Sequence, residues 1–159
     1  MGTDKALIQR DGRYLAEAVA ALLGSCGCSP VCVVGRQANL ADLGWPLVAS
    51  ETGDHHPLLG IAAALECIST EMTLFAPCDL INLQAWHVEA MLAHGEPCVA
   101  WSGDQVQPLL AVIPTSMAGT ARRLAAEGAP AKALTGSLDR INLGGPLLID
   151  ANRPSDLVR

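Results

Sequence analysis

Two periodicities alternate along the chain. In some stretches apolar residues recur every three or four positions, which is the spacing of an amphipathic helix, and between them lie short continuous apolar runs typical of buried strands. The stretches with helical spacing are residues 14–26, 57–69, 83–95 and 115–128. The strand-like runs are residues 30–35, 46–50, 72–77, 97–102, 107–114 and 146–150, and a terminal helix is expected from residue 154. Strands that alternate with helices predict an α/β sandwich with a mostly parallel sheet.

Residues with known positional preferences support these helix boundaries. Pro57 suits the first turn of its helix, and Gly95 and Gly128 suit the position just beyond the end of theirs. Thr115 or Ser116 is expected to cap the helix over residues 115–128. The strands at 97–102 and 107–114 follow each other closely enough to form hairpin-like neighbours.

Polar residues at the carboxyl ends of the predicted strands mark the expected ligand-binding edge of the sheet. Asp79 directly follows the strand at 72–77, where a carboxylate can hold Mg²⁺ together with substrate phosphates. Asp150 and Asn152 end the last strand on the same side and are also oxygen ligands. The alternative interpretations are a helix cap or turn for Asp79 and turn chemistry before Pro154 for the other pair.

Lys5 is the third candidate, in a chain whose only other lysine is Lys132. It ends a Gly-Thr-Asp-Lys run that resembles the exit of a glycine-rich phosphate loop, and its ammonium group suits a triphosphate. A solvated lysine near a chain end is the alternative. Each candidate is a weak signal alone, but the strand order can bring all of them to one edge.

Composition narrows the class of protein. The chain has 159 residues, half of them apolar, and a net charge of -6, which fits one domain with one core. The basic residues are scattered without interleaved aromatics, so no nucleic-acid partner is expected. No apolar run has transmembrane length, so no membrane association and a cytoplasmic location are expected.

The cysteines at positions 26 to 32 form a CGCSPVC cluster that invites a metal interpretation. The cluster has no second half with structural-zinc spacing and no nearby histidine. Ordinary thiols are favoured because Cys32 and Cys98 lie in apolar strand-like runs, where cysteine behaves as a small hydrophobic residue. Disulfides are not expected in the cytosol.

Six segments taken in order resemble molybdenum cofactor guanylyltransferases, the MobA family. They are MGTDKALI, GRYL, PLLGIAAAL, PCD, QPLLAV and NRPSDL, and they span nearly the whole chain. The resemblance implies one nucleotidyltransferase domain over residues 1–159, with a three-layer, Rossmann-like nucleotide-binding sandwich. It also implies that GMP passes from GTP to molybdopterin with release of pyrophosphate, that Mg²⁺ is required, and that other proteins of molybdenum cofactor biosynthesis are partners.

The resemblance also implies roles for individual residues. Gly2, Asp4 and Lys5 would form the tail of the triphosphate loop, and Arg36 and Gly60 would contribute to nucleotide binding. Asp79 would hold Mg²⁺ with Asn152 as its second protein ligand. Lys5 and Asp79 would be the catalytic residues.

The chain departs from the family pattern at several positions. His56 stands where the family has a glycine, and Gly35 stands where it often has asparagine. The acidic residue usually found shortly before that glycine has no clean counterpart, although Glu51 and Asp54 are candidates. These departures leave two alternatives: a nucleotidyltransferase of the same fold for CTP or a sugar phosphate, or a non-catalytic, decayed paralogue.

The largest departure is at the start, because MGTDK lies in the middle of the family's phosphate-loop motif. The resemblance places a strand of about five residues and a Gly-Gly turn before Met1. A mis-assigned start is favoured over a truncated form or a decayed gene. Without the backbone N–H groups of that turn, the form that begins at Met1 is expected to bind GTP and Mg²⁺ poorly and to show no measurable transfer.

Overall fold

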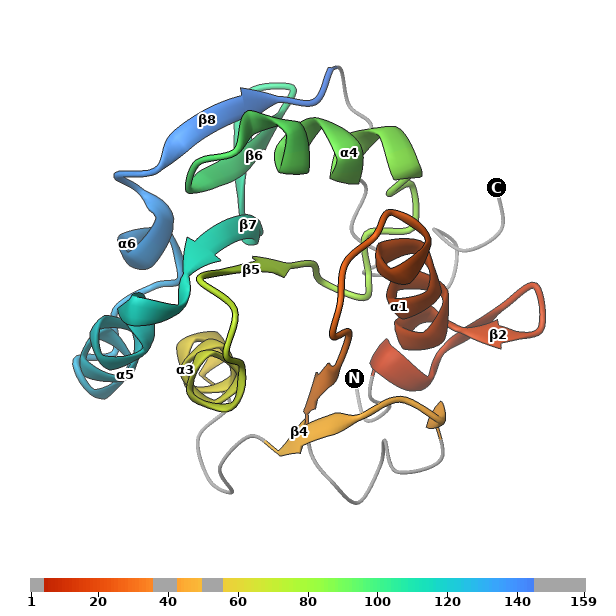
Figure 1. The fold of residues 1–159 in the computed structure, drawn as a ribbon, viewed down its shortest axis with the longest axis horizontal. Coiled ribbons are helices and arrows are strands. Elements are labelled where there is room, and N and C mark those ends of the chain that lie inside the picture. Colours follow the sequence, from red (N-terminus) through yellow and green to blue (C-terminus); the bar gives the residue numbers. More distant parts are fainter. Residues whose placement is uncertain (1–4, 36–42, 50–55, 145–159) are drawn as a thin grey trace.

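The computed structural model describes residues 5–35, 43–49 and 56–144, which Figure 1 shows in colour. The helices are η1 (Lys5–Leu7, a 3-10 turn), α1 (Leu15–Ser25), α3 (Pro57–Cys67), α4 (Ala85–His94), η3 (Thr115–Met117, also 3-10), α5 (Ala118–Ala126) and α6 (Lys132–Thr135). The strands are β1 (Gln9–Arg10), β2 (Arg13–Tyr14), β3 (Val33–Gly35), β4 (Leu47–Ala49), β5 (Met72–Phe75), β6 (Cys98–Ser102), β7 (Gln105–Pro114) and β8 (Asp139–Asn142). The predicted α/β class is therefore confirmed.

The largest sheet has the strand order β5-β7-β6-β8. β7 pairs antiparallel with both β5 and β6, whereas β6 and β8 are parallel. β6 and β7 are joined by only Gly103 and Asp104, and so short a connection forces them to be antiparallel. The described strands thus form a mixed sheet rather than the mostly parallel one that the alternation of elements predicts.

Both faces of this sheet are covered, because neighbouring residues of β6 and β7 point to opposite sides. One cluster of buried residues joins the sheet to α3, α5 and α6, and contains Leu58, Ile61, Ala62, Leu65, Val99, Ala111, Ile113, Ala121 and Leu134. The cluster on the other face includes Met91 of α4 and consists of Leu80, Met91, Cys98, Ala100, Leu110, Val112 and Leu143. Figure 1 shows the resulting layers, with α4 on one side of the sheet and α3 and α5 on the other.

A second, smaller sheet consists of the parallel strands β3 and β4. It packs with α1 and η1 through a separate cluster of apolar residues. The buried members of that cluster are Ala6, Ala16 and Leu43, and Val33, Trp45 and Leu47 are among the partly buried ones. In the described residues, no strand joins this pair to the larger sheet.

The helix ends follow the sequence signals in most cases. Pro57 is the first residue of α3 and follows the N-cap residue His56. Gly95 follows α4 with a φ of 75° and Gly128 follows α5 with a φ of 66°. Glycine adopts this left-handed conformation at little cost, so these predicted boundaries are confirmed.

The predicted cap of the fifth helix is wrong. Residues 115–117 form the 3-10 turn η3, and α5 begins only at Ala118, without a side-chain cap. The Thr115 hydroxyl instead donates a hydrogen bond to the carbonyl of Thr70, in the loop before β5. The Thr115 hydroxyl therefore joins two segments that are distant in the chain, and it is not available to cap α5.

Besides the short helices η1 and α6, two parts of the fold have no counterpart in the sequence-based prediction. One is the hairpin of β1 and β2, which turns at Asp11 and Gly12 with φ values of 54° and 79°. An Asp-Gly pair is a strong hairpin signal, so this element was predictable. The other is the edge strand β8. The predicted strand at 146–150 and the terminal helix from 154 lie outside the described residues.

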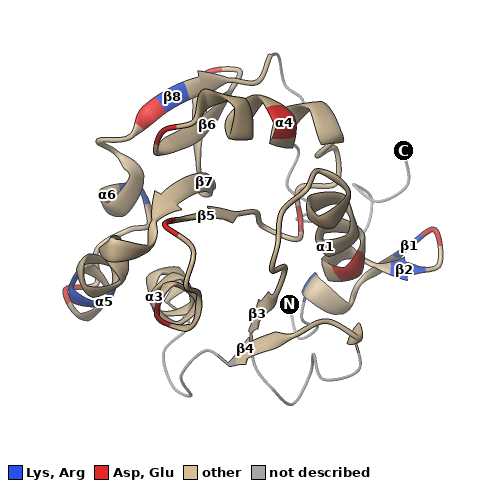
Figure 2. Ribbon diagram, viewed as in Figure 1, with Lys and Arg blue, Asp and Glu red and all other residues tan. Residues whose placement is uncertain are grey.

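Charged residues lie at the periphery of the described fold, and Figure 2 shows the basic ones on the β1–β2 hairpin, α5 and β8. Arg122 of α5 forms two hydrogen bonds with Glu66 of α3, at 2.9 and 2.7 Å. Arg123 pairs within α5 with Glu127 at 2.7 Å. No helix of the described residues is long and apolar enough to cross a bilayer.

Candidate functional site

The structure brings together the two residues that the sequence singled out as catalytic. The Nζ atom of Lys5 donates a hydrogen bond to Oδ2 of Asp79 at 2.9 Å, across 74 positions of sequence. The side chains are 33% and 19% exposed, so both remain within reach of a ligand. The two weak sequence signals thus belong to one place in the fold.

Local structure explains why these side chains meet. Asp79 lies in the turn that follows β5, where Ile81 donates a backbone hydrogen bond to the Asp79 carbonyl at 3.0 Å. Leu80, only 2% exposed, anchors this turn in the core. Arg10 of the β1–β2 hairpin donates to the Ile81 carbonyl at 3.1 Å, which ties the segment after Lys5 to the turn after Asp79.

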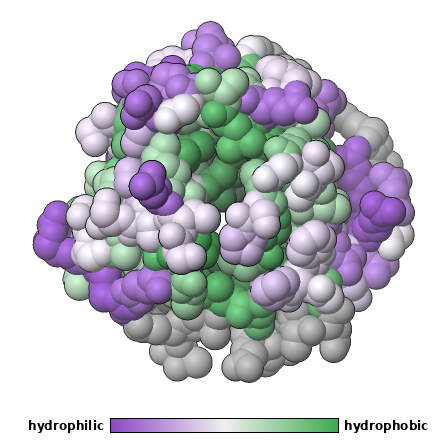
Figure 3. Space-filling model, in the orientation of Figure 1, coloured by the Kyte–Doolittle hydropathy of each residue, from purple (hydrophilic) through white to green (hydrophobic). Residues whose placement is uncertain are grey.

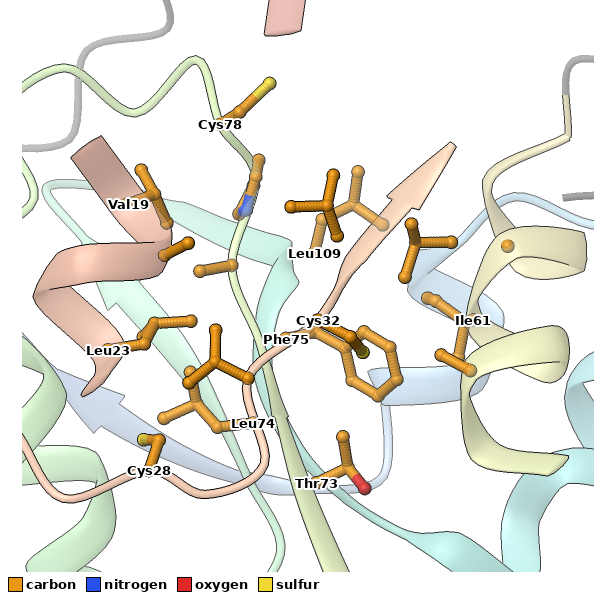
Figure 4. Close-up of a pocket in the computed structure, with 18 of the residues that line it drawn as sticks. Val19, Leu23, Cys28, Cys32, Ile61, Thr73, Leu74, Phe75, Cys78 and Leu109 are labelled. Carbon is orange, nitrogen blue, oxygen red and sulfur yellow. The ribbon is translucent and has the colours of Figure 1, made fainter. Parts of the chain in front are cut away.

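A cavity of about 910 Å³ opens beside this ion pair, between the small sheet and the large one. Its walls come from α1, β3, α3 and β5, and Figure 3 shows the molecule hollowed near its centre over an apolar floor. Asp79 is the only carboxylate among the described residues that line the cavity. The ion pair therefore lies at the edge of a largely apolar space (Figure 4).

Thiols also line this cavity without adding charge to it. Cys28 and Cys32 are among the lining residues. Burial raises the pKa of both thiols, so they are protonated and neutral at pH 7. All six cysteines of the chain are free, and no group of three or more metal-binding side chains occurs among the described residues.

The start of α3 shows what His56 and Gly60 do in this chain. The Nδ1 atom of His56 accepts a hydrogen bond from the backbone N–H of Leu58 at 3.3 Å, so the imidazole caps the helix in place of a smaller polar residue. Gly60 lies against β3, where an added Cβ would come within 3.2 Å of a Val34 methyl group. The structure assigns Gly60 a packing role, and its expected role in nucleotide binding stays a prediction.

The remaining predicted site residues lie outside the part of the chain that the structure describes. They are Gly2, Asp4, Arg36 and Asn152, together with Asp150, the alternative to Asn152. The sequence analysis missed Arg10, which contacts the turn after Asp79, and the helix cap formed by His56. The Asp-Gly turn beside Arg10 was the available signal for the hairpin that carries Arg10.

The Lys5–Asp79 pair suits the binding of a metal-bound phosphate ester. A partly exposed carboxylate is a suitable oxygen ligand for a hard divalent cation. The Lys5 ammonium places a positive charge 2.9 Å from Oδ2 of this carboxylate. In open α/β sheets ligands bind beyond the carboxyl ends of the strands, and Asp79 lies at such an end, after β5.

The comparisons with known proteins identify the family. Residues 1–141 match the family model described as the MobA-like NTP transferase domain, and the chain belongs to this family. The resemblance seen in the sequence, the nucleotidyltransferase fold and the enzyme class are thereby confirmed.

Several curated relatives share the name that the sequence suggested. A molybdenum cofactor guanylyltransferase of Serratia proteamaculans is 31% identical over 132 residues, which cover 80% of this chain and 67% of the relative. The enzyme of the same name from Ectopseudomonas mendocina is 35% identical over 73% of this chain and 60% of its own length. The chain thus matches about two thirds of the length of these relatives.

Solved structures share the fold at lower identity. Molybdopterin-guanine dinucleotide biosynthesis protein A of Archaeoglobus fulgidus superposes with a TM-score of 0.72 and 19% identity, over 99% of this chain and 89% of its own. The Mycobacterium tuberculosis protein Rv0371c superposes with a TM-score of 0.79 and 17% identity, over 100% and 90%. A manganese complex of Rv0371c superposes with a TM-score of 0.71 and 14% identity, over 99% and 91%.

Proposed function

We propose that this chain is a molybdenum cofactor guanylyltransferase, which transfers GMP from GTP to molybdopterin and releases pyrophosphate. Family membership and the shared name of the relatives support this function. The observation that supports it in this chain is the 2.9 Å contact between Lys5 and Asp79, because it brings together the two side chains that we propose to act in the reaction. Residues 1–159 would act as one domain.

Each residue has a defined part in the proposed reaction. An oxygen of the molybdopterin phosphate bonds to the α-phosphorus of GTP while the bond from that phosphorus to the β-phosphate oxygen breaks. The attacking oxygen is already anionic, so positioning and charge neutralisation do most of the work. Asp79 would hold Mg²⁺, with Asn152 as a further ligand, and this ion would neutralise charge on the phosphates. Lys5 would bind the oxygens of the leaving pyrophosphate.

When the nucleotide binds, Lys5 and Asp79 would separate, and each would gain a new partner of opposite charge. In the structure Lys5 and Asp79 neutralise each other. A metal–triphosphate complex offers a cation to Asp79 and an anion to Lys5, so both charges find new partners in one step. Partial exposure keeps the cost of separating the pair small.

Separate observations support the proposed metal and the proposed cellular location. Mg²⁺ is proposed because it binds through one or two carboxylates together with substrate phosphates, which matches the single carboxylate at the described cavity. A fold neighbour solved with manganese is consistent with a divalent cation. A cytoplasmic location is proposed because the six cysteines are unpaired. Other proteins that act on the molybdenum cofactor would be partners for delivery of the acceptor.

A transfer assay with Asp79→Asn, made in the full-length protein, tests the proposal. The substrate is GTP with a radioactive α-phosphate, and the assay measures the radioactivity that is transferred to the pterin product. Asp79→Asn should reduce the rate by at least about 10²-fold, because it removes the charge that holds the cation. Asp139→Asn is the matched control, since Asp139 lies on β8 with a 72% exposed side chain and pairs with His94. Equal rates for Asp79→Asn and Asp139→Asn would overturn the role of Asp79.

The same assay separates the alternative functions. Transfer from CTP in preference to GTP would identify a cytidylyltransferase, and transfer to a sugar phosphate would identify a different acceptor class. A non-catalytic paralogue would bind nucleotide or pterin without transfer. That alternative has one structural observation in its favour, because His56 replaces a small residue at the start of α3 beside the cavity.

A further inference from the structure

The two residues of the proposed site are anchored in different parts of the fold. Lys5 is followed by Ala6, which is buried in the apolar cluster of the small sheet. Asp79 is followed by Leu80, which is buried in the cluster between the larger sheet and α4. The Nζ–Oδ2 contact of 2.9 Å joins the two side chains, but the distance between their backbones depends on other contacts that link the two clusters.

Arg10 makes such a contact. It lies on β1, five residues after Lys5, in the basic hairpin that Figure 2 shows. Its Nη1 atom donates a hydrogen bond at 3.1 Å to the carbonyl of Ile81, two residues after Asp79. A guanidinium group is a charged donor, and hydrogen bonds of this kind are roughly twice as strong as those between neutral groups. Arg10 therefore links the segment that carries Lys5 to the turn that carries Asp79.

Short hydrogen-bonded paths connect this link to both site residues. The backbone N–H of Ile8 donates to the Lys5 carbonyl at 3.1 Å, and the β1–β2 hairpin fixes the chain from residue 9 onward. On the other side, the N–H of Ile81 donates to the Asp79 carbonyl at 3.0 Å. A change at the Arg10–Ile81 hydrogen bond would therefore move Lys5 relative to Asp79.

We propose that Arg10 is a positioning residue, which keeps Lys5 at the distance from Asp79 that a metal-bound triphosphate requires. The proposal rests on the proposed function, in which nucleotide binding separates Lys5 from Asp79. Once these side chains have separated, their own hydrogen bond no longer fixes the distance between them. The Arg10–Ile81 bond joins a side chain and a backbone carbonyl, neither of which takes part in the proposed reaction, so it persists in the complex.

Arg10 would act through this hydrogen bond and not through its charge. The Arg10 Nε atom lies 3.8 Å from Oδ2 of Asp11, and the Asp11 side chain is 94% exposed, so water screens this pair. Arg13 carries the same charge, is paired with Arg10 across the hairpin and is exposed. Comparison of the two arginines therefore separates the effect of the hydrogen bond from that of the charge.

Three binding measurements on Arg10→Leu, made in the full-length protein, test the proposal. They are the affinity for Mn²⁺ alone, by electron paramagnetic resonance, and the affinities for GTP alone and for Mn²⁺ with GTP, by calorimetry. The first two should match wild type, because each of these ligands needs only one of the two site residues. Mn²⁺ with GTP should bind at least about fivefold more weakly, because this ligand needs both residues at a fixed distance.

Arg13→Leu is the matched control, because it removes the same charge from the same hairpin, and all three affinities should match wild type. Arg10→Lys restores a charged donor and should bind Mn²⁺ with GTP more tightly than Arg10→Leu does. The melting temperature of each variant is measured alongside, because a fold that is merely loosened would weaken the binding of all three ligands together. Arg10→Gln, which is shorter and polar, replaces Arg10→Leu if the latter does not fold.

The rate of GMP transfer gives a second readout. Arg10→Leu should lower kcat by at least about tenfold, because misplaced reacting groups react slowly. Three results would overturn the proposal: equal binding of Mn²⁺ with GTP by Arg10→Leu and wild type, equal weakening in Arg13→Leu, and equal weakening of all three ligands in Arg10→Leu. If Asp79→Asn stops transfer while Arg10→Leu behaves as wild type, only the role of Arg10 fails. Normal transfer by Asp79→Asn would instead reject the role of Asp79 in the proposed function, and the role of Arg10 with it.

Discussion

Lys5 and Asp79 are distant in the chain but become hydrogen-bond partners at 2.9 Å, at the edge of the cavity. A partly exposed pair of this kind contributes only roughly 0–1 kcal/mol to stability, because water screens it. It can therefore open for a ligand at little cost. The sequence identified both residues from their local context, but only the fold shows that they touch.

Replacing Lys5 should separate metal binding from nucleotide binding. Lys5→Met removes the positive charge beside Asp79, so a divalent cation alone should bind the carboxylate several-fold more tightly. The triphosphate should bind about tenfold more weakly, because the variant lacks a cation for its oxygens. Electron paramagnetic resonance of Mn²⁺ measures the first effect, and calorimetric titration with GTP measures the second. Weaker Mn²⁺ binding in Lys5→Met would contradict the competition between the two cations.

His87 makes folding stability depend on pH. Its ring is 1% exposed, its Nδ1 accepts a hydrogen bond from the Gln84 N–H at 2.9 Å, and its Nε2 has no partner among the described residues. Burial lowers the pKa of His87 from its usual value of 6.5, so the fold favours the neutral ring. The unfolded state then binds the proton more readily, and this stabilisation is full above pH 6.5 and lost as the pH falls below it.

Urea unfolding of wild type and His87→Gln at two pH values measures this contribution. Between pH ~7.5 and ~5.5 the wild type should lose more unfolding free energy than the variant, which has no ring to protonate. The carboxylates and the other histidines are common to both proteins and cancel in the difference. An identical loss in the two proteins would show that His87 titrates alike in the folded and unfolded states.

At the scale of elements, periodicity predicted α1, α3 and α4 to within a few residues, because each buries one face in the core. The hairpin β1–β2 was predictable from Asp11 and Gly12, because an Asp-Gly pair is a strong turn signal. The start of α5 was not predictable, because the Thr115 hydroxyl binds the Thr70 carbonyl of a distant segment instead of capping the helix. Local sequence is thus informative until tertiary contacts compete for the same groups.

Gly60→Ala tests how closely α3 packs on β3. Alanine favours a helix by up to about 1 kcal/mol over glycine. The new methyl group would approach Val34 to 3.2 Å, and Val34 borders the cavity, into which it can shift. We therefore expect a small net stabilisation, measured as the melting temperature.

The control for this change is Gly119→Ala in α5, where an added Cβ meets nothing within 4 Å. It should raise the melting temperature at least as much as Gly60→Ala does, and the difference between the two reports the contact with Val34. A marked destabilisation by Gly60→Ala alone would show that β3 is held rigidly against α3. Weaker GTP binding by this variant would support the role of Gly60 in the nucleotide site.

For the whole molecule, the topology could be predicted only in part. The two-residue link between β6 and β7 makes their antiparallel pairing readable from sequence. The strand order β5-β7-β6-β8 could not be predicted from the sequence. The order of strands along the chain does not specify that β7 lies between β5 and β6. The cavity between β3 and β5 was also invisible in the sequence, because it results from how the two sheets are placed.

The division into two sheets should appear in hydrogen exchange. β6 and β7 are hydrogen-bonded within the larger sheet and buried at Val99, Leu110 and Ile113, whereas β3 is partly exposed and borders a cavity. Amides of β3 and β4 should therefore exchange at least tenfold faster than those of β6 and β7. Residue-resolved exchange by NMR measures the ratio. Equal rates would mean that the two sheets open as one cooperative unit.

The roles of Asp79 and Lys5 are tested most directly by a crystal structure of the protein with Mn²⁺ and a non-hydrolysable GTP analogue, in which anomalous scattering locates the metal. We expect Mn²⁺ at about 2.1 Å from an Asp79 carboxylate oxygen, the usual distance for a small divalent cation. We also expect the Lys5 ammonium to have moved from Asp79 to a phosphate oxygen. A nucleotide-bound metal placed elsewhere, with the Lys5–Asp79 pair still intact, would show that these two residues do not have the proposed roles.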